Sequence, residues 1–384
     1  EHVFHALTMV LVLLAFKKYL ENEAPRNFSN LALLSILATG FRYESLFFIF
    51  FMCVYLFFIK KEYFQSIALG LFAMTPVLIY GWISLDHGSF FLPNSLILKG
   101  NTNDGIVGFL TRVAGNGYRG LSVLILILIL LIQIFRNIKS AKLSNTPTLQ
   151  HSKNAIPMIV FCGFAVHLLF ANFGWLIRYE AYLVVIILFA IAPFADELFQ
   201  KKIGNQVLKF SMVILLLITF SLRFVPMLKN QPKASKNIFD QQIQLADFLH
   251  QYYKNSKVVA NDIGAITYFN NIHLLDTYGL GSIEVAKLRK EDHGKFTDNK
   301  KLQAYIYNTA KLQDFEVALV FDEWVKMPDY FSKVGTLTIQ NNYMAGGTTV
   351  SFYAVKKENT DKLRNQLVEF SKQTPKDVII NIIK

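Results

Sequence analysis

Apolar stretches separated by short polar segments fill the first 226 residues of the chain. They lie at residues 3–16, 28–38, 46–58, 65–85, 121–135, 156–173, 176–194 and 207–225. A helix of about 20 apolar residues is long enough to cross the hydrocarbon core of a bilayer. The pattern therefore predicts a multi-spanning helical membrane domain over residues 1–226, although the stretch 28–38 is short for a complete span.

One polar interruption, residues 86–118, is much longer than the others. It contains Asn94, Lys99 and Arg112. A loop of this length inside a compact protein is usually functional or disordered. We therefore expect the loop to contribute to a functional face of the protein.

The pattern changes after Pro226. A polar segment at 229–236 predicts a linker, and apolar positions near a 3.6-residue period predict an amphipathic helix over 240–253. Strands are expected at 257–260, 273–276 and 315–321, then an antiparallel pair at 335–340 and 348–355, and then a helix over 361–373. The predicted fold class is a polytopic α-helical membrane domain followed by a small α/β soluble domain over residues 227–384.

Composition supports this division. Hydrophobic residues make up 53% of the chain, and residues 227–384 hold 21 of the 39 basic and 17 of the 27 acidic side chains, which leaves 18 and 10 for residues 1–226. Despite the net charge of +12, we expect no nucleic-acid partner, because much of the basic excess lies in short loops between apolar segments. Cys53 and Cys162 lie inside apolar runs and are expected to be buried small side chains. No Cys/His cluster indicates a metal.

The distribution of basic residues predicts the orientation of the membrane domain. Loops 17–30, 60–64, 136–155 and 196–206 hold eleven Lys and Arg residues in total, whereas the alternate loops 40–45, 86–118 and 174–178 hold four. Cytoplasmic loops carry the excess of Lys and Arg, so the first set is assigned to the cytoplasm. If 28–38 and 46–58 count as two passes, the long loop and the C-terminal domain both lie on the outer face.

Two arginines interrupt the apolar pattern. Arg42 and Glu44 stand between the second and third stretches, and Arg178 and Glu180 stand near the start of the seventh. Ionisable groups at membrane depth are costly and indicate a functional site. A guanidinium on the outer face could grip a phosphate through two parallel hydrogen bonds, with the carboxylates as counter-charges or as ligands of sugar hydroxyls. The alternative is that each arginine only anchors a helix end at the interface.

Other polar residues have a structural interpretation beside the functional one. Asn94 suits a turn, where Asn and Pro are common, and Asp262 stands where it would cap a helix. His2 shares a helical face with Glu1, whereas His167 lies deep in an apolar run and is expected to be a core residue.

Several short motifs, taken in order, resemble a known family. They are Glu1-His2 at the start of an apolar helix, the turn Gly40-Phe41-Arg42-Tyr43-Glu44, the loop Gly88-Ser-Phe-Phe-Leu-Pro-Asn-Ser, and, in the soluble part, Asp262-Ile-Gly-Ala followed by Asp276-Thr-Tyr-Gly-Leu. The combination resembles polyprenyl-phosphate-sugar-dependent membrane glycosyltransferases of the GT-C type. It is most similar to the bacterial branch that includes the terminal arabinofuranosyltransferases of mycobacterial cell walls. The turn departs from that family's Thr-Arg-Pro-Glu pattern, because Tyr43 stands in place of Pro.

This resemblance implies an inverting transferase of the bacterial cytoplasmic membrane. It would move a sugar from a polyprenyl-phosphate donor to a cell-envelope glycan or lipid acceptor on the outer face. The resemblance also implies that the catalytic acidic residue lies in a loop upstream of Glu1, outside these 384 residues. It leaves a divalent metal cofactor open, because enzymes of this type differ in metal use. The expected substrate-binding residues are Glu1, His2, Arg42, Glu44, Asn94, Lys99, Arg178 and Asp262.

Two other functions fit the same pattern. A membrane-anchored protein could bind an envelope polymer through its outer domain without any chemistry. A transporter is the third interpretation, but transporters often contain inverted repeats. We find no internal repeat in this sequence, and the large soluble domain at residues 227–384 is unusual for a transporter.

Overall fold

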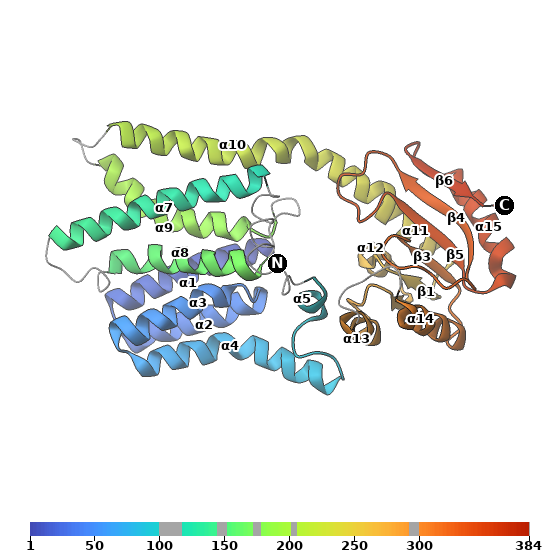
Figure 1. Cartoon of the computed structure of the whole chain (residues 1–384), viewed down its shortest axis with the longest axis horizontal. Coiled ribbons are helices and arrows are strands. Elements are labelled where there is room, and N and C mark those ends of the chain that lie inside the picture. Colours follow the sequence, from blue (N-terminus) through green and yellow to red (C-terminus); the bar gives the residue numbers. More distant parts are fainter. Residues whose placement is uncertain (100–116, 144–151, 172–177, 201–205, 292–298, 384) are drawn as a thin grey trace. The chain divides into compact units, whose positions relative to one another are not determined.

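The computed structural model describes residues 1–99, 117–143, 152–171, 178–200, 206–291 and 299–383 (Figure 1). The chain divides into two compact units. One comprises Glu1–His87 and Gly100–Met227, and the other comprises Gly88–Lys99 and Leu228–Lys384. We call the first the helical unit and the second the α/β unit.

The helical unit is built from long helices that run side by side (Figure 1). They are α1 (His2–Glu21), α2 (Pro25–Phe41), α3 (Ser45–Val54), the π-helical turn η1 (Tyr55–Lys60), α4 (Tyr63–Asp86), α7 (Gly117–Leu143), α8 (Ser152–Phe170), α9 (Ala181–Gln200) and the first two-thirds of α10 (Gln206–Asn237).

Apolar side chains at helical spacing form the core of this unit. On α1, Met9, Leu13 and Phe16 follow one another at steps of four and three residues, and all three are fully buried. Where α3 and α8 meet, Gly163 lies against the ring of Phe48, and a Cβ atom at Gly163 would come within 2.4 Å of that ring. The close approach of these two helices therefore requires glycine.

Five helical segments of the described residues are long and apolar enough to cross a membrane, judged by length and composition. They are His2–Glu21, Tyr63–Asp86, Gly120–Lys139, Ala181–Gln200 and Gln206–Tyr252. Ser45–Lys60 and Asn154–Phe170 are shorter apolar helices. The described parts of the apolar stretches are thus almost entirely helical, with the turn at 178–180 as an exception, but only some of them have the length of a complete span.

Two expectations about helix ends were wrong. The seventh apolar stretch was expected to begin at 176, but α9 begins at Ala181, and residues 178–180 form a turn before it. The segment 229–236 was expected to be a linker, but α10 continues to Asn237 through Pro226 and Pro232. Much of that segment consists of Lys, Gln and Ala. These residues made the segment resemble a polar linker, but they are good helix formers.

The α/β unit contains one six-stranded sheet with strand order β2-β1-β3-β5-β4-β6. The strands are β1 (Lys257–Ala260), β2 (His273–Asp276), β3 (Val317–Val320), β4 (Ser332–Ile339), β5 (Thr349–Ala354) and β6 (Val378–Ile382). Strands β2, β1 and β3 are parallel to one another, whereas β5, β4 and β6 are joined by antiparallel pairing. The sheet is therefore mixed, with its parallel half at the β2 edge.

Helices cover both faces of the parallel half. Val258 packs with α11 (Gln244–Tyr252), α12 (Gly264–Phe269) and α15 (Thr360–Ser371), whereas its neighbour Val259 packs with α13 (Ile283–Glu291) and α14 (Lys300–Leu312). Successive side chains of a strand point to opposite faces, so these two valines belong to two separate cores. This is why β3 is buried along its whole length.

The predicted strands and the helices over 240–253 and 361–373 are confirmed, with ends shifted by a few residues. The helix over 240–253 begins as the π-helical turn η2 (Ile238–Ile243) before α11. Helices α13 and α14 and strand β6 were not predicted. The segment Gly88–Lys99, which holds the short helix α5 (Asn94–Lys99), groups with the α/β unit. Residues 100–116 of the long loop, including Arg112, lie outside the described residues.

Candidate functional site

Charged side chains from separate helices converge on Arg42 at one end of the helical unit. The Arg42 Nη1 atom lies 3.0 Å from Oε1 of Glu1 and 3.1 Å from Nδ1 of His2. Its Nε atom lies 3.3 Å from Oε2 of Glu44, and its Nη2 atom donates to the other oxygen of that carboxylate. Four of the residues expected in the binding site are therefore in contact.

The local chain path explains why Arg42 can make all these contacts. Arg42 is the residue that ends α2, where the backbone leaves the helix in an extended conformation with φ −157°. Its side chain therefore projects beyond the helix, toward Glu1 and His2 at the start of α1. Glu44 lies at the start of α3, only two residues on, so the turn 42–44 brings this carboxylate back onto the guanidinium.

Electrostatics fix Arg42 in its charged form. Burial by itself lowers the pKa of the Arg42 guanidinium, but the hydrogen bond and charge of Glu44, together with the charge of Glu1, outweigh it and hold this pKa above its ordinary value. The Arg42 side chain is only 10% exposed, and that of Glu44 is 16% exposed. A largely buried charge that donates hydrogen bonds to several partners is held in position.

A second arginine reaches the same place. The guanidinium carbon of Arg178 lies 5.3 Å from the centre of the Tyr179 ring, and that of Arg42 lies 5.8 Å from the same centre. Arg178 is exposed, unlike Arg42, and it forms no salt bridge with any residue that the structure describes. Residues 174–177 of the predicted outer loop 174–178 lie outside the described residues.

A layer of uncharged polar groups lies deeper in the helical unit. The buried His5 Nε2 is 2.9 Å from the hydroxyl of Ser45, and this hydroxyl donates to the carbonyl of Ala38. The Tyr182 hydroxyl lies 2.8 Å from Nδ1 of His167, and the rings of His5 and Tyr182 are 4.4 Å apart. His167 is fully buried, as expected of a core residue.

Glu180 does not pair with Arg178, although it is close in sequence. It is fully buried, and its carboxylate lies 3.5 Å from Nη2 of Arg223 on α10. Nη1 of Arg223 also donates to the hydroxyl of Ser122 on α7, over 3.1 Å. This ion pair connects the start of α9 to two other helices, so Glu180 contributes to packing of the bundle rather than to the Arg42 contacts.

One expected site residue of the α/β unit, Asn94, contacts a loop that follows β2. The Asn94 amide donates to the carbonyl of Gly279 over 3.2 Å and also lies 3.4 Å from the carbonyl of Leu280. Gly279 has a φ of +90°, and a Cβ atom there would come within 2.9 Å of the backbone nitrogen of Ala286. The tight loop therefore needs glycine at this position.

Asp276 organises the same loop. Its carboxylate accepts hydrogen bonds from the backbone nitrogens of Tyr278, at 2.7 Å, and Gly281, at 2.8 Å. Burial raises the pKa of the Asp276 carboxyl, although these backbone donors lower it in part. The neighbouring Arg289 is also buried and donates to the carbonyl of Tyr278, beneath whose ring it lies at 4.2 Å. These contacts support a structural role for Asp276.

Asp262 and Lys99 are the other two predicted site residues of the α/β unit. Asp262 was expected to cap α12, but the residue before that helix is Ile263, and the helix has no side-chain cap. The Asp262 carboxylate instead accepts a hydrogen bond of 2.7 Å from the amide of Gln242. Lys99 is the last residue of α5, and its side chain lies outside what the structure describes.

Some members of the Arg42 site had no signal in the sequence. Tyr179 and Tyr182 read as parts of an apolar stretch, and Ser45 reads as a helix start. The arginines and acids were found because charge is rare in such surroundings, whereas tyrosine and serine are common there. No group of three or more metal-binding side chains occurs among the described residues. The site at Arg42 thus consists of guanidinium, carboxylate, imidazole and tyrosine groups.

Comparison with known proteins adds one match. A family model described as "Domain of unknown function (DUF8728)" matches residues 236–353, which lie within the α/β unit. No curated protein and no solved structure matches the chain. The match relates part of the α/β unit to a family but assigns it no activity.

Proposed function

We propose that this protein is a glycosyltransferase of the bacterial cytoplasmic membrane. It transfers a sugar from a polyprenyl-phosphate donor to a cell-envelope glycan or lipid acceptor on the outer face. The resemblance of the motifs at Glu1, Arg42 and Pro93-Asn94 to GT-C-type enzymes suggests this class. The five helices with the length and composition of membrane spans support a multi-pass protein.

The observation that carries the proposal is the difference between the two arginines at Tyr179. Arg42 is held by two carboxylates, so its charge is already balanced. Arg178 is exposed beside the same ring and has no acidic partner among the described residues. A cation in that situation is suited to an anionic ligand, and a guanidinium matches a phosphate in geometry.

The chemistry gives each group a role. As the sugar leaves the donor, negative charge builds on the phosphate that is left behind. A positioned cation stabilises that charge more in the transition state than in the ground state, which raises the rate. We assign this role to Arg178. Arg42 holds the carboxylates of Glu1 and Glu44 in place, where they accept hydrogen bonds from sugar hydroxyls.

Replacement of Arg178 tests the proposal. Losing one charge-assisted hydrogen bond costs about 1.5–3 kcal/mol, which corresponds to roughly tenfold to a hundredfold in rate. In the complete gene product, we expect wild type to transfer sugar fastest and Arg178→Ala slowest. Arg178→Lys should be intermediate, because lysine keeps the positive charge but cannot form two parallel hydrogen bonds to one phosphate. The measurement is turnover of a radiolabelled polyprenyl-phosphate sugar at equal abundance in the membrane.

Arg136→Ala is the matched control. Arg136 also stacks on an aromatic ring of the helical unit, that of Phe194 at 5.0 Å. Phe194 lies 13 residues after the start of α9, or about 20 Å along the helix. Removing Arg136 should leave transfer unchanged. If Arg178→Ala keeps full activity, Arg178 only anchors the helix end at the membrane interface. If the wild-type protein binds glycan but shows no turnover, a non-catalytic envelope-binding protein is favoured.

A further inference from the structure

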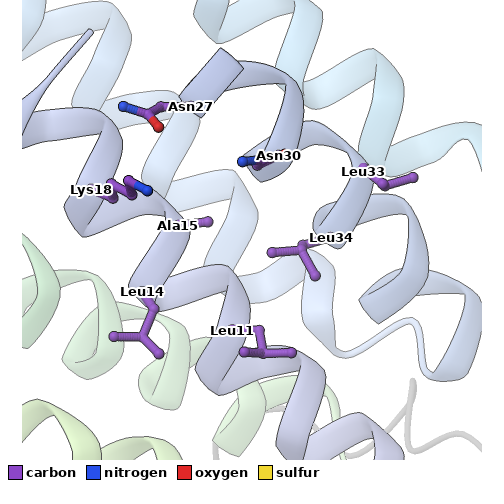
Figure 2. A pocket seen from close by; sticks show the side chains of 8 residues that line it. All are labelled: Leu11, Leu14, Ala15, Lys18, Asn27, Asn30, Leu33 and Leu34. Carbon is purple, nitrogen blue, oxygen red and sulfur yellow. The ribbon is translucent and has the colours of Figure 1, made fainter. Parts of the chain in front are cut away.

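A pocket of about 330 Å³ opens between α1 and α2 of the helical unit (Figure 2). Pockets of roughly 300 Å³ and above are the size that takes small molecules. The residues that line it are Leu11, Leu14, Ala15, Lys18, Asn27, Asn30, Leu33 and Leu34. Five of these side chains are apolar and three carry nitrogen groups, so the pocket is amphipathic.

The polar and apolar side chains occupy different ends of the pocket. Helices α1 and α2 form a hairpin whose turn lies between Glu21 and Pro25. Lys18 and Asn27 are each only a few residues from that turn, whereas Leu11 and Leu34 are each seven residues, about two helical turns, further away. Figure 2 shows Lys18, Asn27 and Asn30 toward one end and Leu11 and Leu14 toward the other.

The polar end offers hydrogen-bond donors to a ligand. Lys18 is exposed and forms no salt bridge with the described residues, whereas its neighbour Lys17 lies 3.9 Å from Glu21. The amide nitrogen of Asn27 donates to the carbonyl of Asn22 over 2.8 Å and so helps to fix the turn. Lys18, together with the exposed amide of Asn30, therefore faces the pocket as a donor group.

The apolar end is open to the surroundings of the protein. Leu11 is 36% exposed, Leu14 44% and Leu33 57%. Leucines that line a hollow and remain this accessible suit contact with hydrocarbon chains, while a lysine at the same helix end can extend its ammonium group to the membrane interface. The chemistry of the pocket thus changes along its length in the same way as that of a lipid.

We propose that this pocket binds an anionic phospholipid. The phosphate of the headgroup pairs with the ammonium group of Lys18 and accepts a hydrogen bond from Asn30, and an acyl chain lies along Leu11, Leu14 and Leu34. Charge complementarity identifies this ligand, because a lysine is a phosphate-binding point charge and basic pockets between membrane helices bind anionic headgroups.

This lipid site is separate from the Arg42 site. Asn27 and Arg42 are 15 residues apart on α2, which corresponds to about 22 Å along the helix. The loop distribution of basic residues assigns the α1–α2 turn to the cytoplasmic side and Arg42 to the outer side. The bound phospholipid therefore comes from the cytoplasmic leaflet and is not the sugar donor.

Native mass spectrometry of the delipidated full chain in detergent tests the proposal. The protein is titrated with phosphatidylglycerol and, separately, with phosphatidylcholine that carries the same acyl chains. We expect phosphatidylglycerol to bind several-fold more tightly, and Lys18→Gln to weaken its binding by about tenfold, as the loss of one charge-assisted contact predicts. Leu14→Trp, which fills the pocket, should weaken binding of both lipids.

Two variants serve as controls. Lys17→Gln makes the same charge change one residue away, and Leu37→Trp adds the same bulk at a leucine of α2 that is 45% exposed but does not line the pocket. Both should bind lipid like wild type. The proposal would be overturned if Lys18→Gln bound phosphatidylglycerol as tightly as wild type, or if Lys17→Gln lost as much affinity as Lys18→Gln. It would also be overturned if a co-purifying protein occupied the pocket in place of lipid.

The proposal uses the part of the proposed function that places the helices in a membrane, together with the orientation that the basic loops predict. Loss of transfer activity in Arg178→Ala says nothing about this pocket, and failure of lipid binding says nothing about transfer. The two experiments therefore fail independently of each other.

Discussion

The helical unit and the α/β unit each hold a largely buried ionisable side chain, Arg42 and Asp276, and the two side chains are satisfied in different ways. Arg42 is neutralised by Glu44, two residues further along the chain, and by Glu1, which lies 41 residues away in the sequence. Asp276 is satisfied by backbone nitrogens of residues that follow within five positions. Arg42 therefore depends in part on tertiary contacts, whereas Asp276 depends on the backbone of its own loop.

This difference indicates which of the two residues, Arg42 or Asp276, can take part in binding a ligand. A carboxylate surrounded by its own backbone donors has no capacity left for a ligand, so its removal should cost stability. A guanidinium shared between ionisable side chains, one of them exposed, and lying near a second, exposed arginine can respond to a substrate. Asp276 therefore belongs to the framework of the α/β unit, and Arg42 belongs to the proposed active site.

The largest expected effect is that of Asp276→Ala on the α/β unit. It leaves several backbone donors of a buried loop without their acceptor, which should lower the free energy of unfolding by about 3 kcal/mol. Trp324 reports on this loop because its ring lies 5.2 Å from that of Tyr278. Denaturant unfolding followed by tryptophan fluorescence, with Trp82 and Trp175 replaced by Phe, measures the change.

Glu369→Ala is the control for that experiment. Glu369 pairs with Lys372 at the surface of α15, and its side chain is 62% exposed, so its loss should leave the unfolding midpoint unchanged. An Asp276→Ala protein that unfolds like wild type would show that the loop is not organised by this carboxylate.

Arg42→Ala should have a smaller effect on stability and should be rescued by a second change. Removing the guanidinium leaves Glu44 without its partner, at a cost of about 2 kcal/mol, less than for a fully buried pair because both groups touch solvent. Arg42→Ala combined with Glu44→Ala should recover about half of this loss. Cys53 and Cys162 are both half-buried in the helical unit, so a thiol-reactive fluorescent dye reports on its unfolding.

The double variant decides between two readings of the Arg42 contacts. Recovery of stability means that the unpaired carboxylate caused the loss. If the double variant is less stable than either single variant, the guanidinium contributes mainly through Tyr179 or His2 and not through Glu44.

The smallest expected effect is that of Asn94→Ala, which removes the amide that joins α5 to the Gly279 carbonyl. We expect a loss of about 1 kcal/mol, confined to the segment 88–99. Hydrogen exchange of the backbone amides in this segment should become faster, while exchange in β1 and β3 stays the same. Ser95→Ala, at an exposed position of the same helix, should not alter exchange, and faster exchange throughout the unit would contradict a local role.

The sequence by itself was enough to locate most helices and strands and the few charged residues that interrupt apolar stretches. Periodicity and apolar length located the helices of the first half and most strands of the second, because these patterns arise from neighbours in the chain. Arg42 and Arg178 were found because charge inside apolar surroundings is costly. The predicted end of α10 was too early, because the polar residues after Pro226 have the pattern of a linker but form a helix in the folded protein.

Only the tertiary structure decided which partners these residues have. Arg42 contacts Glu1 and His2 because α1 and α2 form a hairpin, whereas Glu180, two residues from Arg178, pairs with Arg223 on another helix. The grouping of Asn94 with the α/β unit likewise depends on a contact across 185 residues. Sequence patterns record which face of an element is buried, but not which distant element covers that face, because that choice depends on packing among all of them.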